Sequence, residues 1–240
     1  MWGLIPVAGE GSRLRSVTEG APKCLVEVEG RPLVHHLLDR LQAVCSRACV
    51  VVPGEDELIR RALRSHPFGR EASVVVQDEP RGLRDAVSQA LPVVSPPTLL
   101  VMGDSYFAQG FQEVLSGQRA GEGGLLVEGA GTDPGEPAGW VVADPDGCAT
   151  RLWKGSPASP DAQRVAGGFV LEGRVFGLLG TRSGTGSFEA TLDEAIQAGA
   201  RYRLLAVTGP RWNVNTPGQL ESLRAWARAQ AVADATPVRR

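Results

Sequence analysis

The feature that most constrains the fold is a stretch of about thirty residues near the start of the chain, from Leu4 to Leu33. It begins with a short apolar run, which is typical of a buried strand, and breaks at Gly9 into the sequence Gly-Glu-Gly-Ser-Arg. Ten residues after Arg13 the chain presents the pair Pro22-Lys23. This order of strand, glycine-rich turn and two cations is the layout of a phosphate-binding loop.

The chemistry of such a loop assigns a role to each of these residues. Gly9 and Gly11 carry no Cβ, so main-chain N–H groups can approach a polyphosphate closely, while Arg13 and Lys23 neutralise its charge. Walker A would require Gly-Lys-Ser/Thr, and the dinucleotide pattern would require glycine at Leu14, so both are excluded. The alternative is a bare turn with solvated cations, but a bare turn does not require Arg and Pro-Lys at these offsets.

The whole string resembles the signature of sugar-1-phosphate nucleotidylyltransferases, and its Ile-Pro-Val-Ala-Gly opening is similar to that of UTP-glucose-1-phosphate uridylyltransferases. The resemblance covers roughly Leu4 to Arg224 and is strongest before Asp104. It implies a Rossmann-like, GT-A-like nucleotidyltransferase fold and an activity that depends on Mg²⁺. It further implies catalytic roles for Arg13, Lys23 and Asp104, and a nucleotide site that includes Ala8, Gly9, Gly11 and Ser12.

The composition argues against nucleic-acid and membrane partners. The chain has 240 residues and a formal net charge of -2, which argues against a nucleic-acid partner because such surfaces carry a basic excess. No apolar run approaches the roughly 20 residues of a membrane span, and the N-terminus lacks the basic region of a signal peptide. We therefore expect no membrane partner and a cytoplasmic location. The four cysteines form no C-x-x-C pair and are expected to be free and buried.

Periodicity predicts an α/β fold: a mostly parallel twisted sheet with helices on both faces, whose ligands collect where strands end. After the first strand, we expect strands at 48–52, 73–77 and 98–102 and helices at 32–43, 55–65 and 82–91. Later strands are expected at 124–128, 139–143, 149–153, 165–171 and 202–207, and later helices at 174–179, 189–199 and 217–233.

The domain organisation expected from this pattern is a single nucleotidyltransferase domain over residues 1–234. Its nucleotide-binding half spans 1–120, and its sugar-phosphate-binding half, a smaller substrate-facing β subdomain, spans 121–215. A C-terminal helix at 216–234 follows, and 235–240 is expected to be a disordered tail.

Candidate metal ligands follow the fourth strand and precede the last helix. Asp104 matches the family's Gly-Asp motif, whose aspartate binds Mg²⁺; the alternative is that it caps a helix. The family's second ligand is usually an aspartate, but here the corresponding string holds Asn213 and Asn215. Asparagine offers a carbonyl oxygen without charge, as in some amino-sugar uridylyltransferases. Asn213 is the candidate ligand, with Asn215 open as a second candidate or as a helix cap.

Two further groups are candidates for the substrates. Gln77 and Gly82 resemble the segment that holds the pyrimidine in glucose-1-phosphate thymidylyltransferases, although guanylyl- and cytidylyltransferases share the framework. Lys154 matches the lysine that holds the sugar's phosphate, and Gly139 and Gly167 match glycines that line that pocket. Two departures, Trp153 in place of a carboxylate and Val165 in place of asparagine, indicate an acceptor unlike plain glucose-1-phosphate; simple packing is the other interpretation of Trp153.

These residues together predict a nucleotidylyltransferase. An oxygen of a sugar-1-phosphate, or of a similar phosphorylated metabolite, attacks the α-phosphorus of an NTP, preferably a pyrimidine nucleotide, giving an NDP-sugar and pyrophosphate. The enzyme is expected to be a monomer or homodimer. One alternative is a nucleotide-binding regulator that has lost catalysis, motivated by Asn213, Trp153 and Val165. A GT-A glycosyltransferase is disfavoured because Asp104 is not part of an Asp-x-Asp motif.

Overall fold

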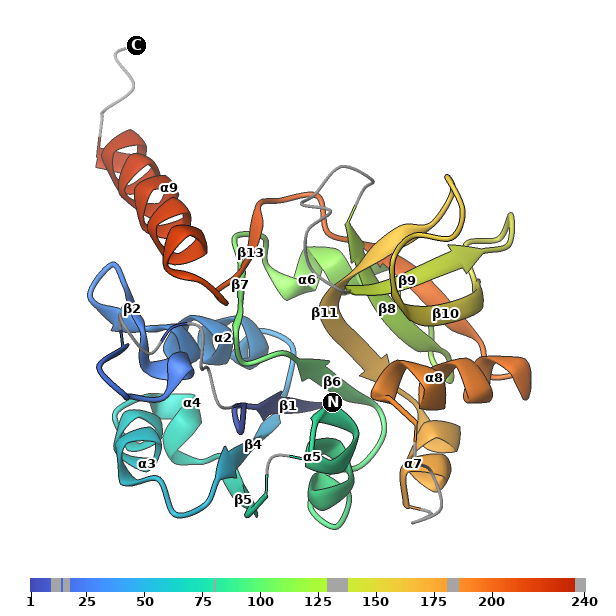
Figure 1. Ribbon diagram of the computed structural model, residues 1–240, viewed down its shortest axis with the longest axis horizontal. Helices are drawn as coiled ribbons and strands as arrows, with labels where there is room; N and C mark the ends of the chain where they lie inside the picture. Colours follow the sequence, from blue (N-terminus) through green and yellow to red (C-terminus); the bar gives the residue numbers. More distant parts are fainter. Residues whose placement is uncertain (10–13, 15–17, 80, 129–137, 181–185, 236–240) are drawn as a thin grey trace.

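A nine-stranded mixed sheet forms the centre of the protein (Figure 1). The computed structural model describes residues 1–9, 14, 18–79, 81–128, 138–180 and 186–235. Seven strands follow each other in the order β10-β9-β11-β6-β1-β4-β5, and β8 pairs with both β11 and β12. The strands are β1 (Trp2–Pro6), β4 (Arg47–Pro53), β5 (Ser73–Gln77), β6 (Thr98–Val101), β8 (Gly123–Glu128), β9 (Ala138–Ala143), β10 (Ala149–Gly155), β11 (Gln163–Leu171) and β12 (Tyr202–Ala206).

Strand direction changes at β11. Strands β6, β1, β4 and β5 are parallel to one another, as the expected strand–helix alternation requires. Strand β11 is antiparallel to β6, β8 and β9, and β9 and β10 form an antiparallel pair. The strands of the second half therefore continue the sheet of the first half, and the expected α/β class is confirmed.

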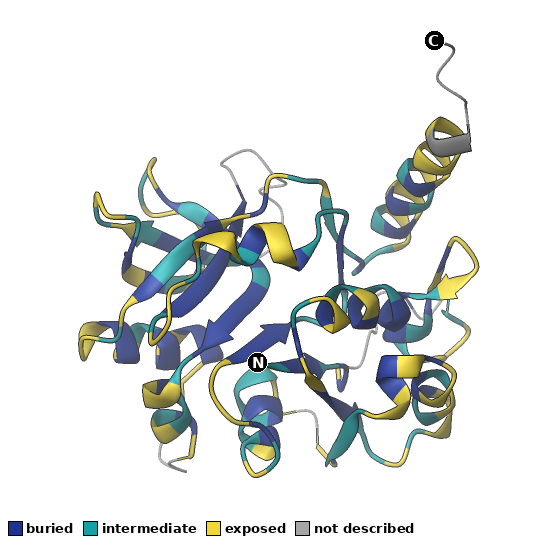
Figure 2. Ribbon diagram, turned by 180° about the vertical axis from the view of Figure 1, so that it is seen from behind, coloured by how far each residue is buried: buried dark blue, intermediate teal, exposed yellow. Residues whose placement is uncertain are grey.

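Helices cover both faces because successive strand residues point to opposite sides. In β1, Ile5 packs into one core cluster and Leu4 into the other, and both side chains are fully buried. Figure 2 shows these buried strands between partly exposed helices. One face carries α2 (Leu33–Gln42), α3 (Glu57–Arg64), α4 (Pro67–Arg70) and α6 (Phe111–Val114); the other carries α5 (Leu83–Ala90), α7 (Gly173–Gly180) and α8 (Phe188–Gln197).

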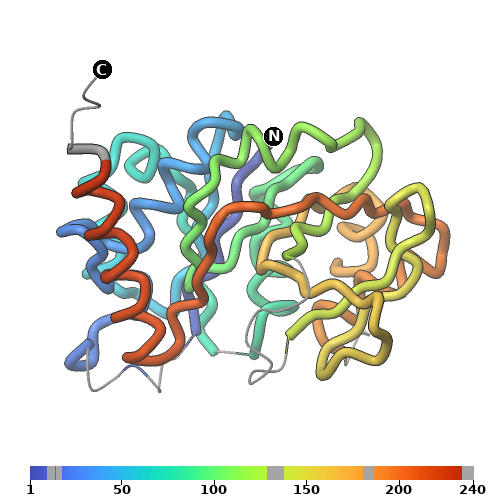
Figure 3. Tube along the Cα trace, turned by 90° about the horizontal axis from the view of Figure 1, so that it is seen from above, coloured from blue at the N-terminus to red at the C-terminus, as the bar shows by residue number. Residues whose placement is uncertain are grey.

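The C-terminal helix α9 (Pro217–Ala235) returns to the first half of the chain, as Figure 3 shows. Its buried residues Leu220 and Leu223 form a third cluster with Leu33 and Tyr106. Two short ribbons complete the fold: β2 (Glu27–Val28) with β3 (Arg31–Pro32), and β7 (Ser105–Phe107) with β13 (Arg211–Asn213). Short 3₁₀ turns span Lys23–Leu25 and Leu115–Gly117.

Two further expectations concern membranes and cysteines. Within the described ranges, none of the helices combines the length and the apolar character that a membrane span requires. All four cysteines are free and buried, as expected.

Candidate active site

Lys23 and Asp104 lie in contact beyond the ends of the parallel strands. The Nζ of Lys23 donates a hydrogen bond to Oδ2 of Asp104 at 2.8 Å and another to Oδ1 of Asn215. The Lys23 and Asp104 side chains are 14% and 24% exposed. The ion pair is therefore shielded from bulk water but still within reach of a ligand.

A tight contact between β6 and the end of β1 fixes the turn that carries Asp104. The N–H of Gly103 donates to the carbonyl of Pro6 at 3.3 Å. A Cβ at position 103 would lie 2.6 Å from that carbonyl oxygen and 2.6 Å from a methyl group of Val7. Only glycine fits at this position, so Asp104 is held close to the residues that follow β1.

The two asparagines near α9 differ in their surroundings. Oδ1 of Asn213 accepts hydrogen bonds from Ser105 Oγ at 3.1 Å and from Arg211 at 2.5 Å. Oδ1 of Asn215 instead contacts Lys23, beside Asp104. Of the two amide oxygens, that of Asn215 is the better placed to share a cation with Asp104.

A capping box at the start of α9 argues against the interpretation that Asn215 caps this helix. Thr216 Oγ1 accepts from the N–H of Gln219, and Oε1 of Gln219 accepts in return from the N–H of Thr216. The helix cap is therefore Thr216, and the Oδ1 of Asn215 contacts Lys23. We propose Asn215 rather than Asn213 as the second metal ligand.

A first cavity of about 280 Å³ extends from this ion pair toward the end of β5. The sequence-predicted residues that line it are Ala8, Gly9, Lys23, Gln77, Gly82 and Asp104. Gly11, Ser12 and Arg13, which were also predicted to bind the nucleotide or act in catalysis, lie outside the described residues. The cavity thus joins the two ends of the predicted nucleotide site, although they are distant in sequence.

Gln77 closes the far end of the first cavity. Its Nε2 donates to Oδ2 of Asp85 at 2.6 Å and to the carbonyl of Gly82 at 3.3 Å. The side chain is almost fully buried, with 4% of the residue exposed. Asp85 was not among the residues predicted from the sequence; its place in the first turn of α5, eight residues after Gln77, was the available signal.

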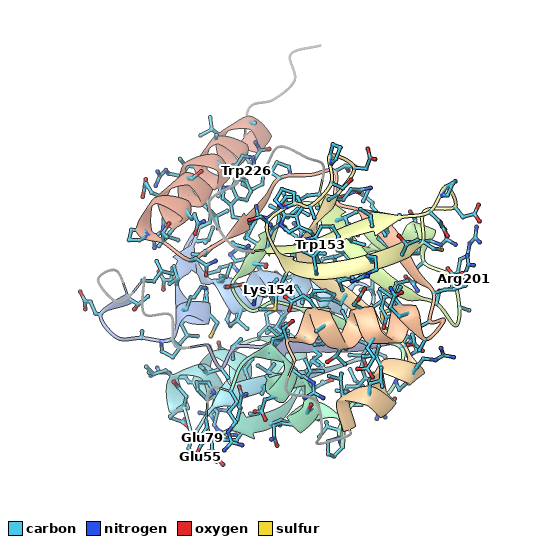
Figure 4. The ribbon with its side chains drawn as sticks, turned by 45° about the vertical axis from the view of Figure 1, so that its right-hand side comes forward. Glu55, Glu79, Trp153, Lys154, Arg201 and Trp226 are labelled. Atoms are coloured by element: carbon cyan, nitrogen blue, oxygen red, sulfur yellow. The ribbon has the colours of Figure 1, made fainter. Side chains whose placement is uncertain are left out.

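A second cavity of about 570 Å³ meets the first at Gly82, Leu83, Met102 and Asp104. Its lining includes the predicted residues Gly139, Lys154, Gly167 and Asn213. Lys154 is on β10 beside Trp153 (Figure 4), and neighbouring strand residues point to opposite faces. Trp153 is absent from the lining and donates its indole N–H to the carbonyl of Ser156. Trp153 therefore takes no part in the lining of the second cavity.

Gly167 lies in a bulge of β11, where this strand lines the second cavity. Its φ of +73° lies in the left-handed region, and the β11–β8 register shifts between Val165 and Phe169. The Gly167 carbonyl accepts from the N–H of Met102 at 2.9 Å. This bulge lets β11 approach the turn after β6 closely.

A buried network of charges that was not predicted from the sequence includes a residue of the second cavity. Both carboxylate oxygens of Glu128 accept hydrogen bonds from the Arg211 guanidinium, at 2.8 and 2.9 Å. Oε1 of Glu128 also lies 3.5 Å from Nη1 of Arg164. Exposure of the three side chains is between 4% and 8%. Arg164 lines the second cavity, as do Arg84 and Glu189, which sequence analysis also missed.

Replacing Glu128 by glutamine is expected to lower the free energy of unfolding by about 3–5 kcal/mol, because two buried guanidinium groups lose their carboxylate. Chemical denaturation measures this loss. The matched control is Glu79→Gln, which also removes a pair with arginine, but at 68% exposure, and should cost less than about 1 kcal/mol. Equal losses in the two variants would contradict the buried role of Glu128.

Cys24 and the adjacent pair His35 and His36 are in environments that indicate structural roles. Cys24 lines the first cavity, but burial, reinforced by the negative charge of Asp56, raises the pKa of its thiol to about 12. It is therefore a neutral, unreactive group at physiological pH. His35 and His36 each bond a main-chain carbonyl through Nε2, at 2.8 and 3.0 Å, and neither lines the two cavities.

The chemistry of the donor set fits a hard cation. The described part of the chain contains no cluster of three or more His, Cys, Asp or Glu side chains that could hold a metal ion by itself. Asp104 and Asn215 offer a carboxylate and an amide oxygen, and Mg²⁺ is commonly bound by one or two carboxylates together with substrate phosphates. These two residues fit such a shared site.

Known proteins match this chain over most of its length. The model of the nucleotidyl transferase family matches residues 2–224. The bifunctional protein GlmU of Burkholderia mallei (strain SAVP1) is 31% identical over 237 residues, which cover 92% of this chain and 50% of that protein. The chain thus spans about half the length of the curated relatives it matches.

Solved structures share the fold. The inositol-1-phosphate CTP transferase from T. maritima has a TM-score of 0.79 at 19% identity, covering 95% of this chain and 96% of that one. The UTP-bound UGPase from Acinetobacter baumannii has a TM-score of 0.78 at 16% identity, covering 98% and 99%. With the family model matched over the residues that line both cavities, the chain belongs to the nucleotidyl transferase family.

Proposed function

We propose that this enzyme transfers a nucleotidyl group from an NTP, with a pyrimidine base preferred, to a sugar-1-phosphate or a similar phosphorylated metabolite. The observation that carries the proposal is the meeting of two cavities at Asp104, beside Lys23. A triphosphate in the first cavity and an anionic acceptor in the second would bring their phosphates together at this point. The products are an NDP-sugar or analogous diester and pyrophosphate.

In the proposed reaction, an oxygen of the acceptor phosphate attacks the α-phosphorus and the bond to pyrophosphate breaks. Lys23, with Arg13, holds the triphosphate and neutralises charge that moves onto the leaving group. Lys154 holds the acceptor phosphate. Asp104 and Asn215 would hold Mg²⁺, which when bound supplies positive charge to the phosphates. Gln77 and Gly82 contact the base.

Pyrophosphate release tests the proposal. The enzyme is incubated with Mg²⁺, each common NTP in turn, and separate pools of sugar-1-phosphates and phosphorylated alcohols. We expect release that requires both substrates and disappears with EDTA. Absence of release for every combination, or release without any acceptor, would overturn the proposal. The reverse reaction, NTP formation from pyrophosphate and the nucleotide product, confirms which bond is made.

A further inference from the structure

The carboxamide of Gln77 is held in one orientation by two groups that can only accept hydrogen bonds. An ionised carboxylate has no donor, and neither has a main-chain carbonyl. The Gln77 atom that faces both Asp85, at 2.6 Å, and the Gly82 carbonyl, at 3.3 Å, must therefore be the NH₂ group. Turning the amide over would place its oxygen against two other acceptors, so the chemistry of the partners fixes the assignment of nitrogen and oxygen.

This orientation leaves Oε1 of Gln77 to the first cavity. Gln77 lines that cavity, and within the described residues Oε1 accepts no hydrogen bond and is not among the sealed polar atoms without a partner. Gly82 lines the same end, and its N–H donates to no described residue. The end of the cavity therefore presents an acceptor with a fixed direction, close to a main-chain donor.

Pyrimidine bases differ at the edge that such a pair would contact. Uracil and thymine have a ring N–H flanked by carbonyl groups, which complements an acceptor beside a donor. Cytosine has an unprotonated ring nitrogen beside an amino group, which is the reverse pattern. A glutamine that can turn freely accommodates both edges, whereas one that is fixed with its oxygen toward the base opposes cytosine by contact between two lone pairs.

We propose that Asp85 is a positioning residue that fixes Gln77 with Oε1 toward the base, and that the enzyme therefore selects uridine or thymidine triphosphate over cytidine triphosphate. This inference rests on the proposed function, because it takes the first cavity as the nucleotide site. Asp85 itself lies behind Gln77, outside the cavity lining, and acts only through the orientation of the carboxamide.

Direct binding tests the inference without an acceptor. Calorimetric titration of the wild-type enzyme with UTP, dTTP and CTP in Mg²⁺ is expected to show tighter binding of UTP and dTTP than of CTP by roughly ten- to a hundredfold. In Asp85→Asn, the new amide also offers a donor to Gln77, so the carboxamide can turn and the UTP-to-CTP ratio should approach one. Asp85→Ala, which favours helix, is the second variant in case asparagine disturbs α5.

The matched control is Asp78→Asn, which removes one negative charge from the exposed residue next to Gln77 but leaves the carboxamide contacts intact. It should retain the wild-type ratio. In steady-state assays, Asp85→Asn should raise KM for UTP with little change in kcat, a split that general loss of structure would not produce.

The outcomes separate this inference from the proposed function. Equal or preferred binding of CTP by the wild type, or an unchanged ratio in both Asp85 variants, overturns the role of Asp85 while the transfer reaction stands. Failure to bind any nucleotide overturns the proposed function and this inference together.

Discussion

Lys23→Ala is expected to reduce pyrophosphate release by about a thousandfold while the protein stays folded. The Lys23 ammonium is the described cation in contact with Asp104, at the point where the two cavities meet. Removal of a preorganised charge that acts on a developing oxyanion costs about 10²–10³ in kcat, and cations that act on phosphoryl groups contribute at the upper end or beyond. Steady-state rates with saturating NTP and acceptor measure the loss.

Two controls accompany this variant. Arg228→Ala removes a cation from an exposed ion pair with Glu221 on α9 and should leave the rate unchanged. Lys23→Arg keeps the charge but replaces a compact ammonium with a planar guanidinium, so activity should stay low. An active Lys23→Ala enzyme would remove this residue from the mechanism.

Asp104→Ala is expected to abolish both the activity and the response to Mg²⁺. Among the described residues, Asp104 is the one carboxylate that lines both cavities, so its loss removes the charged oxygen ligand proposed for the cation. We expect a rate reduction of about a thousandfold or more. Titration with Mn²⁺ in the presence of NTP, followed by electron paramagnetic resonance, should show weakened metal binding.

Variants of Asn213 and Asn215 test which of the two asparagines binds the metal together with Asp104. Asn215→Ala should also weaken Mn²⁺ binding, whereas Asn213→Ala should change it less, because the Asn213 oxygen already accepts from Ser105 and Arg211. Asp161→Ala, at an exposed loop position, serves as the charge control. An Asp104→Ala enzyme that keeps its Mg²⁺ response would refute the ligand assignment.

Regular elements with clear periodicity were predictable from the sequence. The strand β5 has the predicted bounds, and α2 differs from its predicted bounds by one residue at each end. Both have apolar residues at the spacing of their secondary structure, which is a local signal. The residues predicted around the first cavity follow from the same signal, because parallel strands end at one edge of a sheet.

What the sequence did not reveal depends on contacts between distant residues. The strands β7 and β13 have three residues each, too few to show a period, yet their pairing decides which asparagine approaches Asp104. The contact between Asp85 and Gln77 is a matter of side-chain direction. Glu128, Arg164 and Arg211 are isolated charges in the sequence, and only the folded sheet buries them together.

The bulged strand β11 has a consequence for how such an enzyme can diversify. By pairing with β6 and β9 along one side and with β8 along the other, it sets the spacing of the two cavities through main-chain hydrogen bonds, which depend little on side-chain identity. Part of the wall of the second cavity is built from β9, β10 and α8, away from the parallel strands of the sheet. Replacing side chains there would alter what the proposed acceptor pocket admits without moving it relative to the proposed triphosphate site, which makes this edge the place to redesign.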